Sequence, residues 1–175
     1  YDAEHFFDAW RADRDYSLEC LHAAAGAGAV NLSLCDTNGS SLPDQVGEAV
    51  REVRAEFGEG VELGIHCHND AECGVANSLA AVREGARLAQ GTINGYGERC
   101  GNANLVSILP ALELKMGYRV VGRERLTELS ATSHYVAELL NVPLDSDQAY
   151  VGRNAFAHKG GMHVAGIEAD ARTFE

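Results

Sequence analysis

Residues 61–70 read Val-Glu-Leu-Gly-Ile-His-Cys-His-Asn-Asp, and this stretch decides the fold. Apolar residues occupy every second position at Val61, Leu63 and Ile65, and polar side chains follow, which predicts a strand from Val61 to His66 that opens into a loop at Cys67. The same pattern occurs at residues 29–35, before a polar turn, and at residues 91–94, before a glycine-rich loop. These expected strands begin about thirty residues apart, which is the size of a βαβ unit.

The intervals between the strands carry apolar residues at the three- and four-residue spacing of amphipathic helices. The expected apolar stripes run over residues 18–25, 46–57, 75–86 and 105–112. We expect Ser41 to cap the second of these helices and Gly91 to end the third. A single further helix is expected from Arg123 to Asn141.

The alternation of strands and helices predicts an α/β protein with a parallel sheet, either open and doubly wound or closed as a (β/α)8 barrel. Polar side chains follow every expected strand, in residues 4–5, 36–38, 66–70 and 98–102. Four such loops suit a barrel, whose loops all meet at one mouth, better than an open sheet with one switch point.

A full (β/α)8 TIM barrel takes about 250 residues, and only about three and a half βα units are visible. We therefore expect the C-terminal half of a barrel, whose first half lies outside this chain. Residues 1–121 would run from the end of strand 5 to helix 8. Residues 122–175 would begin a helical linker subdomain after the barrel.

Composition narrows the class of protein. The 175 residues include 14 basic and 26 acidic ones, for a formal net charge of −12, and 46% are hydrophobic. This acidity argues against nucleic acid or an anionic membrane as partner, and no apolar stretch approaches the roughly 20 residues that span a bilayer. Five cysteines without a CxxC pair, and an opening unlike a signal peptide, predict reduced thiols and a cytoplasmic protein.

His66 and His68 are the most informative pair. Residues i and i+2 of a strand point to the same face, so both imidazoles can reach one metal ion. The alternative is two histidines that share one side of a strand and meet solvent. Because Asn69 and Asp70 follow and the next loop ends in Asn102, we favour a metal site. Nitrogen and oxygen donors suit Mg²⁺, Mn²⁺, Co²⁺ or Zn²⁺ without choosing between them.

Residues 95–101, Gly-Tyr-Gly-Glu-Arg-Cys-Gly, leave two interpretations open. Their backbone N–H groups can cradle a phosphate near a helix start, or the glycines can serve a tight turn between strand and helix. Glu98 beside Arg99 can form an ion pair at the rim.

His-Cys-His-Asn-Asp at 66–70, together with Asn-Gly-Tyr-Gly-Glu-Arg-Cys-Gly-Asn at 94–102, resembles the signature of the 2-isopropylmalate, homocitrate and citramalate synthases. These are metal-dependent barrel enzymes that condense acetyl-CoA with a 2-oxo acid. Residues 77–81 and 154–163 also fit, so the resemblance covers essentially the whole chain. Residues 1–8 and 34–39 look most like the citramalate synthase branch.

The resemblance implies an acyltransferase that joins acetyl-CoA to pyruvate, giving citramalate for isoleucine biosynthesis. The alternatives are 2-isopropylmalate synthase, which acts on 2-oxoisovalerate for leucine biosynthesis, and a related barrel lyase or carboxyltransferase. Lys159-Gly160-Gly161 departs from the Glu-Ser-Gly common in isopropylmalate synthases. As half a barrel with an incomplete metal shell, the fragment alone can be inactive.

The resemblance also implies roles for individual residues. The metal ligands would be His66, His68 and Asn102. The substrate-binding residues would be Thr37, which would hydrogen-bond the carboxylate of the 2-oxo acid, Asn94 and Glu98.

Two residues would be catalytic. Glu4 would take part in acid/base handling of the acetyl methyl group, and His163 would reach the site from the partner protomer of a homodimer. The family's Asp ligand and its inhibitor-binding domain have no counterpart in these residues.

Overall fold

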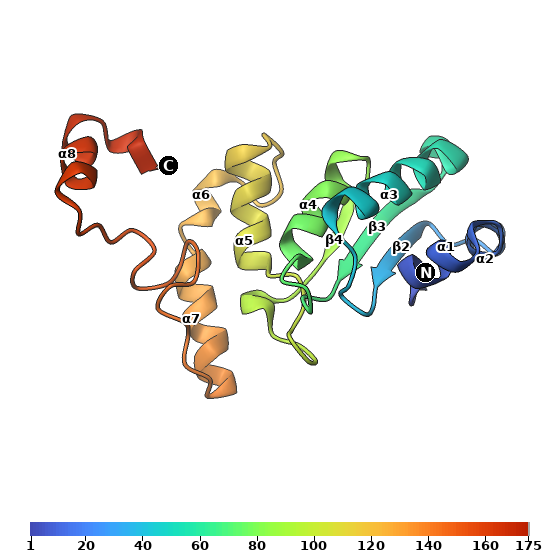
Figure 1. The fold of residues 1–175 in the computed structure, drawn as a ribbon, viewed down its shortest axis with the longest axis horizontal. Helices are drawn as coiled ribbons and strands as arrows, with labels where there is room; N and C mark the ends of the chain where they lie inside the picture. Colours follow the sequence, from blue (N-terminus) through green and yellow to red (C-terminus); the bar gives the residue numbers. More distant parts are fainter. Residues whose placement is uncertain (175) are drawn as a thin grey trace.

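The computed structural model describes residues 1–174, and its centre is a four-stranded parallel sheet in the order β1-β2-β3-β4 (Figure 1). The strands are β1 (Asp2–Ala3), β2 (Asn31–Asp36), β3 (Glu62–Cys67) and β4 (Leu88–Gln90). In register, Cys35 lies opposite His66, and His66 lies opposite Gln90. The predicted parallel α/β architecture is confirmed.

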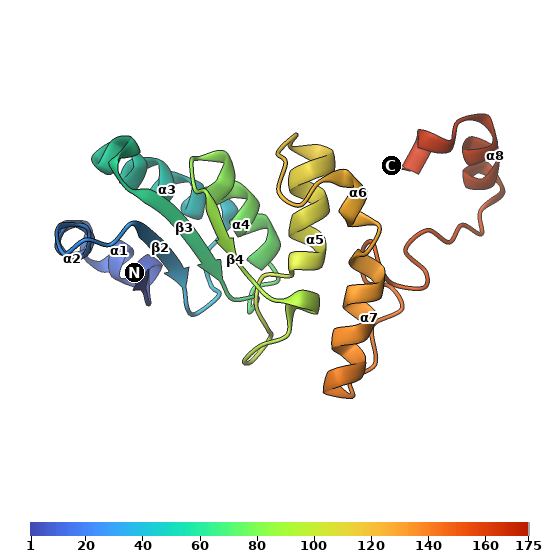
Figure 2. The same cartoon turned by 180° about the vertical axis from the view of Figure 1, so that it is seen from behind.

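Helices follow each strand, and three more α-helices of residues 1–174 lie beyond them. The helices are α1 (Phe6–Ala12), α2 (Arg14–Gly26), α3 (Pro43–Phe57), α4 (Gly74–Arg83), α5 (Leu105–Pro110), α6 (Arg123–Leu126), α7 (Leu129–Leu140) and α8 (Gly161–Ala169). Both views place α3 and α4 side by side against the sheet (Figures 1 and 2). Helices α1 and α2 lie at one end of the molecule and α8 at the other.

The core lies between the sheet and these helices. Strands β2 and β3 are buried on both faces, as parallel strands usually are. Leu32, Leu34, Leu63 and Ile65 are fully buried. The predicted stripe of α3 completes this core, since Val46, Val50 and Val53 are also fully buried.

The third predicted strand is displaced in the structure. Helix α4 ends at Arg83, because Gly85 takes a left-handed φ of 115° that ends the helix. The strand therefore begins early, as β4 at residues 88–90, in place of the predicted residues 91–94. Residues 94–102 then belong wholly to the loop after β4, apart from one 3₁₀ turn, Ile93–Gly95.

Two helix predictions were also wrong. Ser41 does not cap α3, because its hydroxyl donates instead to the buried Oδ1 of Asp36 at 2.9 Å. The helix begins at Pro43, where Gln45 Oε1 accepts the Leu42 N–H at 2.9 Å. The single helix expected over 123–141 is two helices, α6 and α7, and the Thr127 hydroxyl donates to Glu124 O at the break.

A small second hydrophobic cluster joins α7 to α5. Its buried members are Val106, Leu129 and Val151. By contrast, none of the residues of α8 is buried, and Met162 is 86% exposed. Within residues 1–174, no helix combines the length and apolar character needed to cross a membrane.

Candidate metal and substrate site

The loops after all four strands open at the same edge of the sheet, because the strands are parallel. Each loop brings a residue that the sequence singled out. These are Glu4 after β1, Thr37 after β2, His68 after β3 and Asn102 after β4.

Hydrogen bonds fix the orientation of the His66 ring. His66 Nδ1 lies 2.8 Å from Gln90 Oε1. The amide nitrogen of Gln90 donates to Asp2 Oδ1 at 2.9 Å and to Ser33 Oγ at 3.1 Å, so its oxygen must be the group that faces the ring. His66 Nδ1 therefore donates, so in the neutral ring Nε2 carries the lone pair that a metal ligand needs.

His68 and Asn102 lie next to each other, joined by an isolated antiparallel bridge. The His66 and His68 ring centroids are 5.3 Å apart. Burial, together with the nearby Arg99 and His66, lowers the pKa of His68, which favours the neutral imidazole. Asn102 Nδ2 donates to Tyr96 O at 3.2 Å, so Asn102 Oδ1 faces away from Tyr96 O.

His68 and Asn102 each carry a buried side-chain atom without a hydrogen-bond partner. Four buried side-chain atoms of residues 1–174 lack one, and two of the four are His68 Nδ1 and Asn102 Oδ1. Leaving a buried polar atom unsatisfied typically costs about 1–3 kcal/mol. A cation held by this pair and His66 would supply a partner for the Asn102 oxygen, so the three residues fit a divalent metal ion.

The donor set is incomplete within the described residues. No group of three or more His, Cys, Asp and Glu side chains in residues 1–174 is placed to hold a metal ion. Two imidazoles and one amide oxygen leave coordination positions for other ligands.

Thr37 and Glu4 are in direct contact. The Thr37 hydroxyl donates to Glu4 Oε2 at 2.7 Å and accepts the His5 backbone N–H at 2.7 Å. Thr37 is half-buried, whereas Glu4 is exposed. The predicted carboxylate binder and the predicted acid/base residue therefore share one hydrogen bond.

The ion pair at the rim is not the predicted one. Arg99 pairs with Asp70, at 2.8 Å from Nε to Oδ1 and 2.9 Å from Nη2 to Oδ2, and not with Glu98. This hydrogen bond to Arg99 holds the pKa of the Asp70 carboxyl below its usual range. Glu98 is exposed in the same loop. No sequence pattern pointed to Asp70 as the partner, since the two residues lie on different loops.

The glycines of residues 95–101 are explained by the packing of the loop itself. An added Cβ would lie 2.1 Å from Gly95 O at Gly101 and 2.0 Å from Asn102 Nδ2 at Gly97. Gly95 and Gly101 also have left-handed φ angles of 69° and 93°. These contacts favour the tight-turn interpretation over a phosphate cradle.

We predict that Gly97→Ala in the full-length protein weakens divalent metal binding by roughly 10–100-fold, as is typical when the support of a ligand is lost. The new methyl group would displace the Asn102 amide. Gly26→Ala is the matched control, because a Cβ there meets nothing within 4 Å. Competition with a chelator for Co²⁺ measures the affinity, and equal affinities for both variants would contradict the prediction.

The hydrogen bonds of the Asn94 side chain are made to α7 and the segment after it. Its Nδ2 donates to Ser133 O at 2.9 Å, and its Oδ1 accepts from Ser133 Oγ at 2.5 Å and Gln148 Nε2 at 3.2 Å. These contacts connect the loop after β4 to α7 and the segment that follows it. A substrate-binding role for Asn94 stays a prediction.

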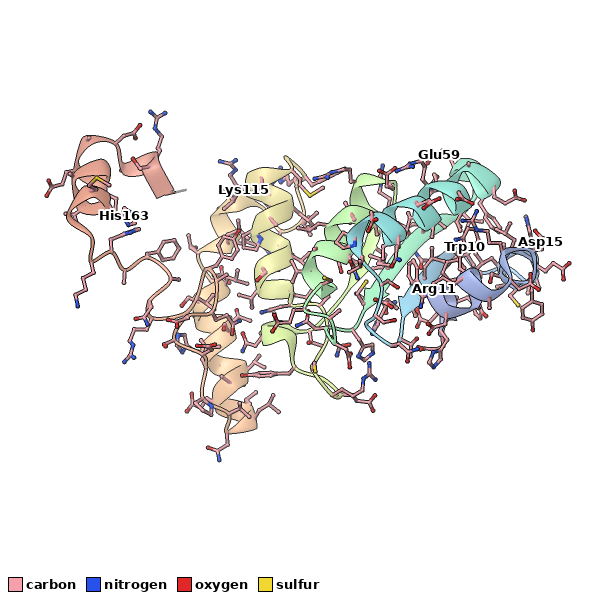
Figure 3. The ribbon with its side chains drawn as sticks, in the orientation of Figure 1. Trp10, Arg11, Asp15, Glu59, Lys115 and His163 are labelled. Carbon is pink, nitrogen blue, oxygen red and sulfur yellow. The ribbon has the colours of Figure 1, made fainter. Side chains whose placement is uncertain are left out.

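His163 lies on α8, at the end of the molecule opposite Trp10 and Arg11 (Figure 3). Its ring meets that of His158 edge-on, with the centroids 6.0 Å apart. Helices α5, α6 and α7 lie between α8 and β3 (Figure 1). Within one chain, His163 is therefore apart from His66 and His68.

Comparison with known proteins identifies the class. The HMGL-like family model matches residues 4–136, and the chain belongs to the HMGL-like family. It is 54% identical over 175 residues to the (R)-citramalate synthase of Geobacter sulfurreducens, covering 100% of this chain and 33% of that protein. It is 39% identical over 171 residues to the 2-isopropylmalate synthase of Pyrococcus abyssi, covering 96% of this chain and 35% of that protein.

The fold agrees with this family. An HMG-CoA lyase structure from Acinetobacter baumannii, in complex with coenzyme A and 3-methylmalate, matches with a TM-score of 0.66 and 27% identity, over 83% of this chain and 48% of that one. The prediction of half a (β/α)8 barrel is confirmed, and so is the resemblance to the citramalate synthase branch. The chain spans about a third of the length of the curated relatives it matches.

Proposed function

We propose that this chain is part of a metal-dependent acyltransferase that joins acetyl-CoA to pyruvate and gives citramalate. The observation that carries the proposal is the set of polar atoms at the mouth of the sheet. His66 keeps Nε2 free, Asn102 Oδ1 is buried without a partner, and Thr37 and Glu4 share a hydrogen bond on the neighbouring loops. The 54% identity to an (R)-citramalate synthase supports the choice of reaction.

The residues divide the work between holding substrate and moving a proton. A divalent ion bound by His66, His68 and Asn102 would polarise the ketone of the 2-oxo acid. Thr37 would hold the substrate carboxylate through its hydroxyl. That hydroxyl has one proton, which it donates to Glu4 in the free protein.

Substrate binding therefore changes the state of Glu4. When the Thr37 hydroxyl turns to the incoming carboxylate, Glu4 Oε2 loses this hydrogen bond and is open to another proton donor. Glu4 would then accept a proton from the acetyl methyl group, and the resulting carbanion would attack the ketone carbon. The electron pair of the C=O bond would move to the ketone oxygen, which would take up a proton to become the hydroxyl of the product. Hydrolysis of the CoA thioester would release free CoA thiol.

A homodimer and a second catalytic residue belong to the same proposal. Helix α8 has no buried residue and lies away from its own sheet, so it is available to a partner protomer. His163 would act there on the partner's site. We also propose a division of the chain into the barrel half, 1–121, and a linker subdomain, 122–175. The five free cysteines suit the reducing cytoplasm, where we place the enzyme as part of isoleucine biosynthesis.

The identity to a 2-isopropylmalate synthase keeps that reaction as the alternative. The two substrates differ by an isopropyl group in place of a methyl group. Each extra methylene is worth only about 1–3 kcal/mol through favourable contact, so a pocket wall that overlaps the larger acid must exclude it.

Release of free CoA thiol from acetyl-CoA by the full-length protein tests the proposal. We expect kcat/KM for pyruvate to exceed that for 2-oxoisovalerate by more than about 100-fold, as steric exclusion requires. A preference for 2-oxoisovalerate would move the assignment to 2-isopropylmalate synthase. Cleavage of a 3-hydroxyacyl-CoA, with no condensation, would move it to the lyases.

A further inference from the structure

We propose that Arg99 is a positioning residue that holds the Thr37 turn in place for the 2-oxo acid. Arg99 belongs to the loop after β4, and Thr37 belongs to the turn after β2. Besides its two bonds to Asp70, Arg99 Nη2 donates to the backbone oxygen of Thr37 at 2.7 Å. The role of Thr37 toward substrate rests on the function proposed above.

One chain of contacts links all four loops at the mouth of the sheet. Arg99 contacts Asp70 after β3 and Thr37 after β2, and the Thr37 hydroxyl contacts Glu4 after β1. The His5 N–H closes the chain on the same hydroxyl. Because the hydroxyl and the backbone oxygen belong to one residue, a shift at Arg99 moves the group that would bind the substrate carboxylate.

The Thr37 turn and the loop that carries Asp70 also pack closely against each other. Gly39 has a left-handed φ of 62°, and an added Cβ there would lie 2.6 Å from Asp70 Oδ2. The Ala71 N–H donates to Gly39 O at 3.0 Å, so the two loops also share a backbone bond. Contacts that do not involve Arg99 therefore hold Asp70 next to the Thr37 turn.

The arrangement favours positioning over direct capture of an anion. The fork of Arg99 is already engaged with a carboxylate through two parallel bonds. A third bond from the same guanidinium goes to a neutral carbonyl, which carries no charge to neutralise. A lysine can keep the positive charge but cannot reproduce this planar set of three bonds.

The test compares Arg99→Lys with Arg51→Lys in the full-length protein. Arg51 of α3 is a matched control, since its side chain pairs with Glu84, the residue after α4, at 2.8 Å and makes no other hydrogen bond within residues 1–174. We expect Arg99→Lys to raise the KM for pyruvate so that kcat/KM falls by roughly 100-fold, as small misplacements of a binding group do. The KM for acetyl-CoA and the retained metal should not change. Arg51→Lys should behave as the wild type.

Hydrogen exchange gives a readout that does not depend on the reaction. In Arg99→Lys, the His5 amide and the peptide covering residues 36–41 should exchange about tenfold faster, because a bond that holds this turn is lost. Asp70→Asn, which weakens the same fork, should produce a smaller change of the same kind. Inactivity of the wild type would refute the proposed function and leave the exchange result standing.

Two results would overturn the proposal. One is unchanged exchange at the His5 amide and residues 36–41 in Arg99→Lys. The other is a rise in the KM for acetyl-CoA alone, which would make Arg99 a direct contact for the coenzyme.

Discussion

The His66→Ala variant of the full-length protein is expected to retain no divalent metal and to lose its metal-dependent activity. His66 holds Nε2 free because Gln90 accepts the hydrogen of Nδ1. Removing this imidazole takes away one of the three metal donors proposed above. Even loss of a residue that merely orients a ligand typically costs 10–100-fold in metal affinity, so loss of the ligand should cost more than about 100-fold.

A graded set of variants makes this test specific. His22→Ala is the control, since His22 is an exposed histidine paired with Glu56 at 2.7 Å on outer helices. Gln90→Leu should fall between the control and His66→Ala, because it removes only the partner of Nδ1. Metal content after gel filtration measures retention. Full metal content in the double variant of His66 and His68 would refute the site.

Mixing two inactive variants, His163→Ala and His66→Ala, is expected to restore activity. In a homodimer with composite sites, a hybrid has one site in which both histidines are intact. Random exchange of subunits makes about half of all dimers hybrids, so about a quarter of the wild-type activity should return. Each variant alone should have almost none.

The mixing experiment separates action in trans from action within one chain. If His163 served its own barrel, no hybrid would contain a complete site and the activity would not recover. Subunit exchange should be verified with tagged chains. Mixing His163→Ala with wild-type protein provides the control for exchange itself.

Much of the fold could be predicted because burial leaves a periodic trace in the sequence. The strand at residues 61–66 shows apolar residues at every second position, and α3 follows the helical spacing. The helix boundaries that were predicted wrongly depended on the behaviour of single residues. Gly85 ends α4 six residues before the glycine chosen from the sequence, and Ser41 binds Asp36 although it has the chemistry of a helix cap.

The candidate site, like the fold, could be predicted from the sequence only in part. His66 and His68 could be paired from sequence, because spacing along one strand fixes which side chains share a face. Gln90, Asp70 and Arg99 could not be placed, because their contacts join different loops and depend on the register between strands. Asn94 belongs to the recognised motif, yet its amide is engaged by Ser133 and Gln148, which the motif does not contain.

Residues 145–157, the segment that leads to α8, are anchored to the rest of the chain. Gln148 is bound to Asn94, Val151 packs in the second cluster, and Asn154 is bonded back to Asp147 and Ser146. Residues 158–160 connect this anchored segment to α8. Helices α5, α6 and α7 lie between α8 and β3 (Figure 1), so the catalytic role proposed for His163 would be exerted on the barrel of a second copy of the chain.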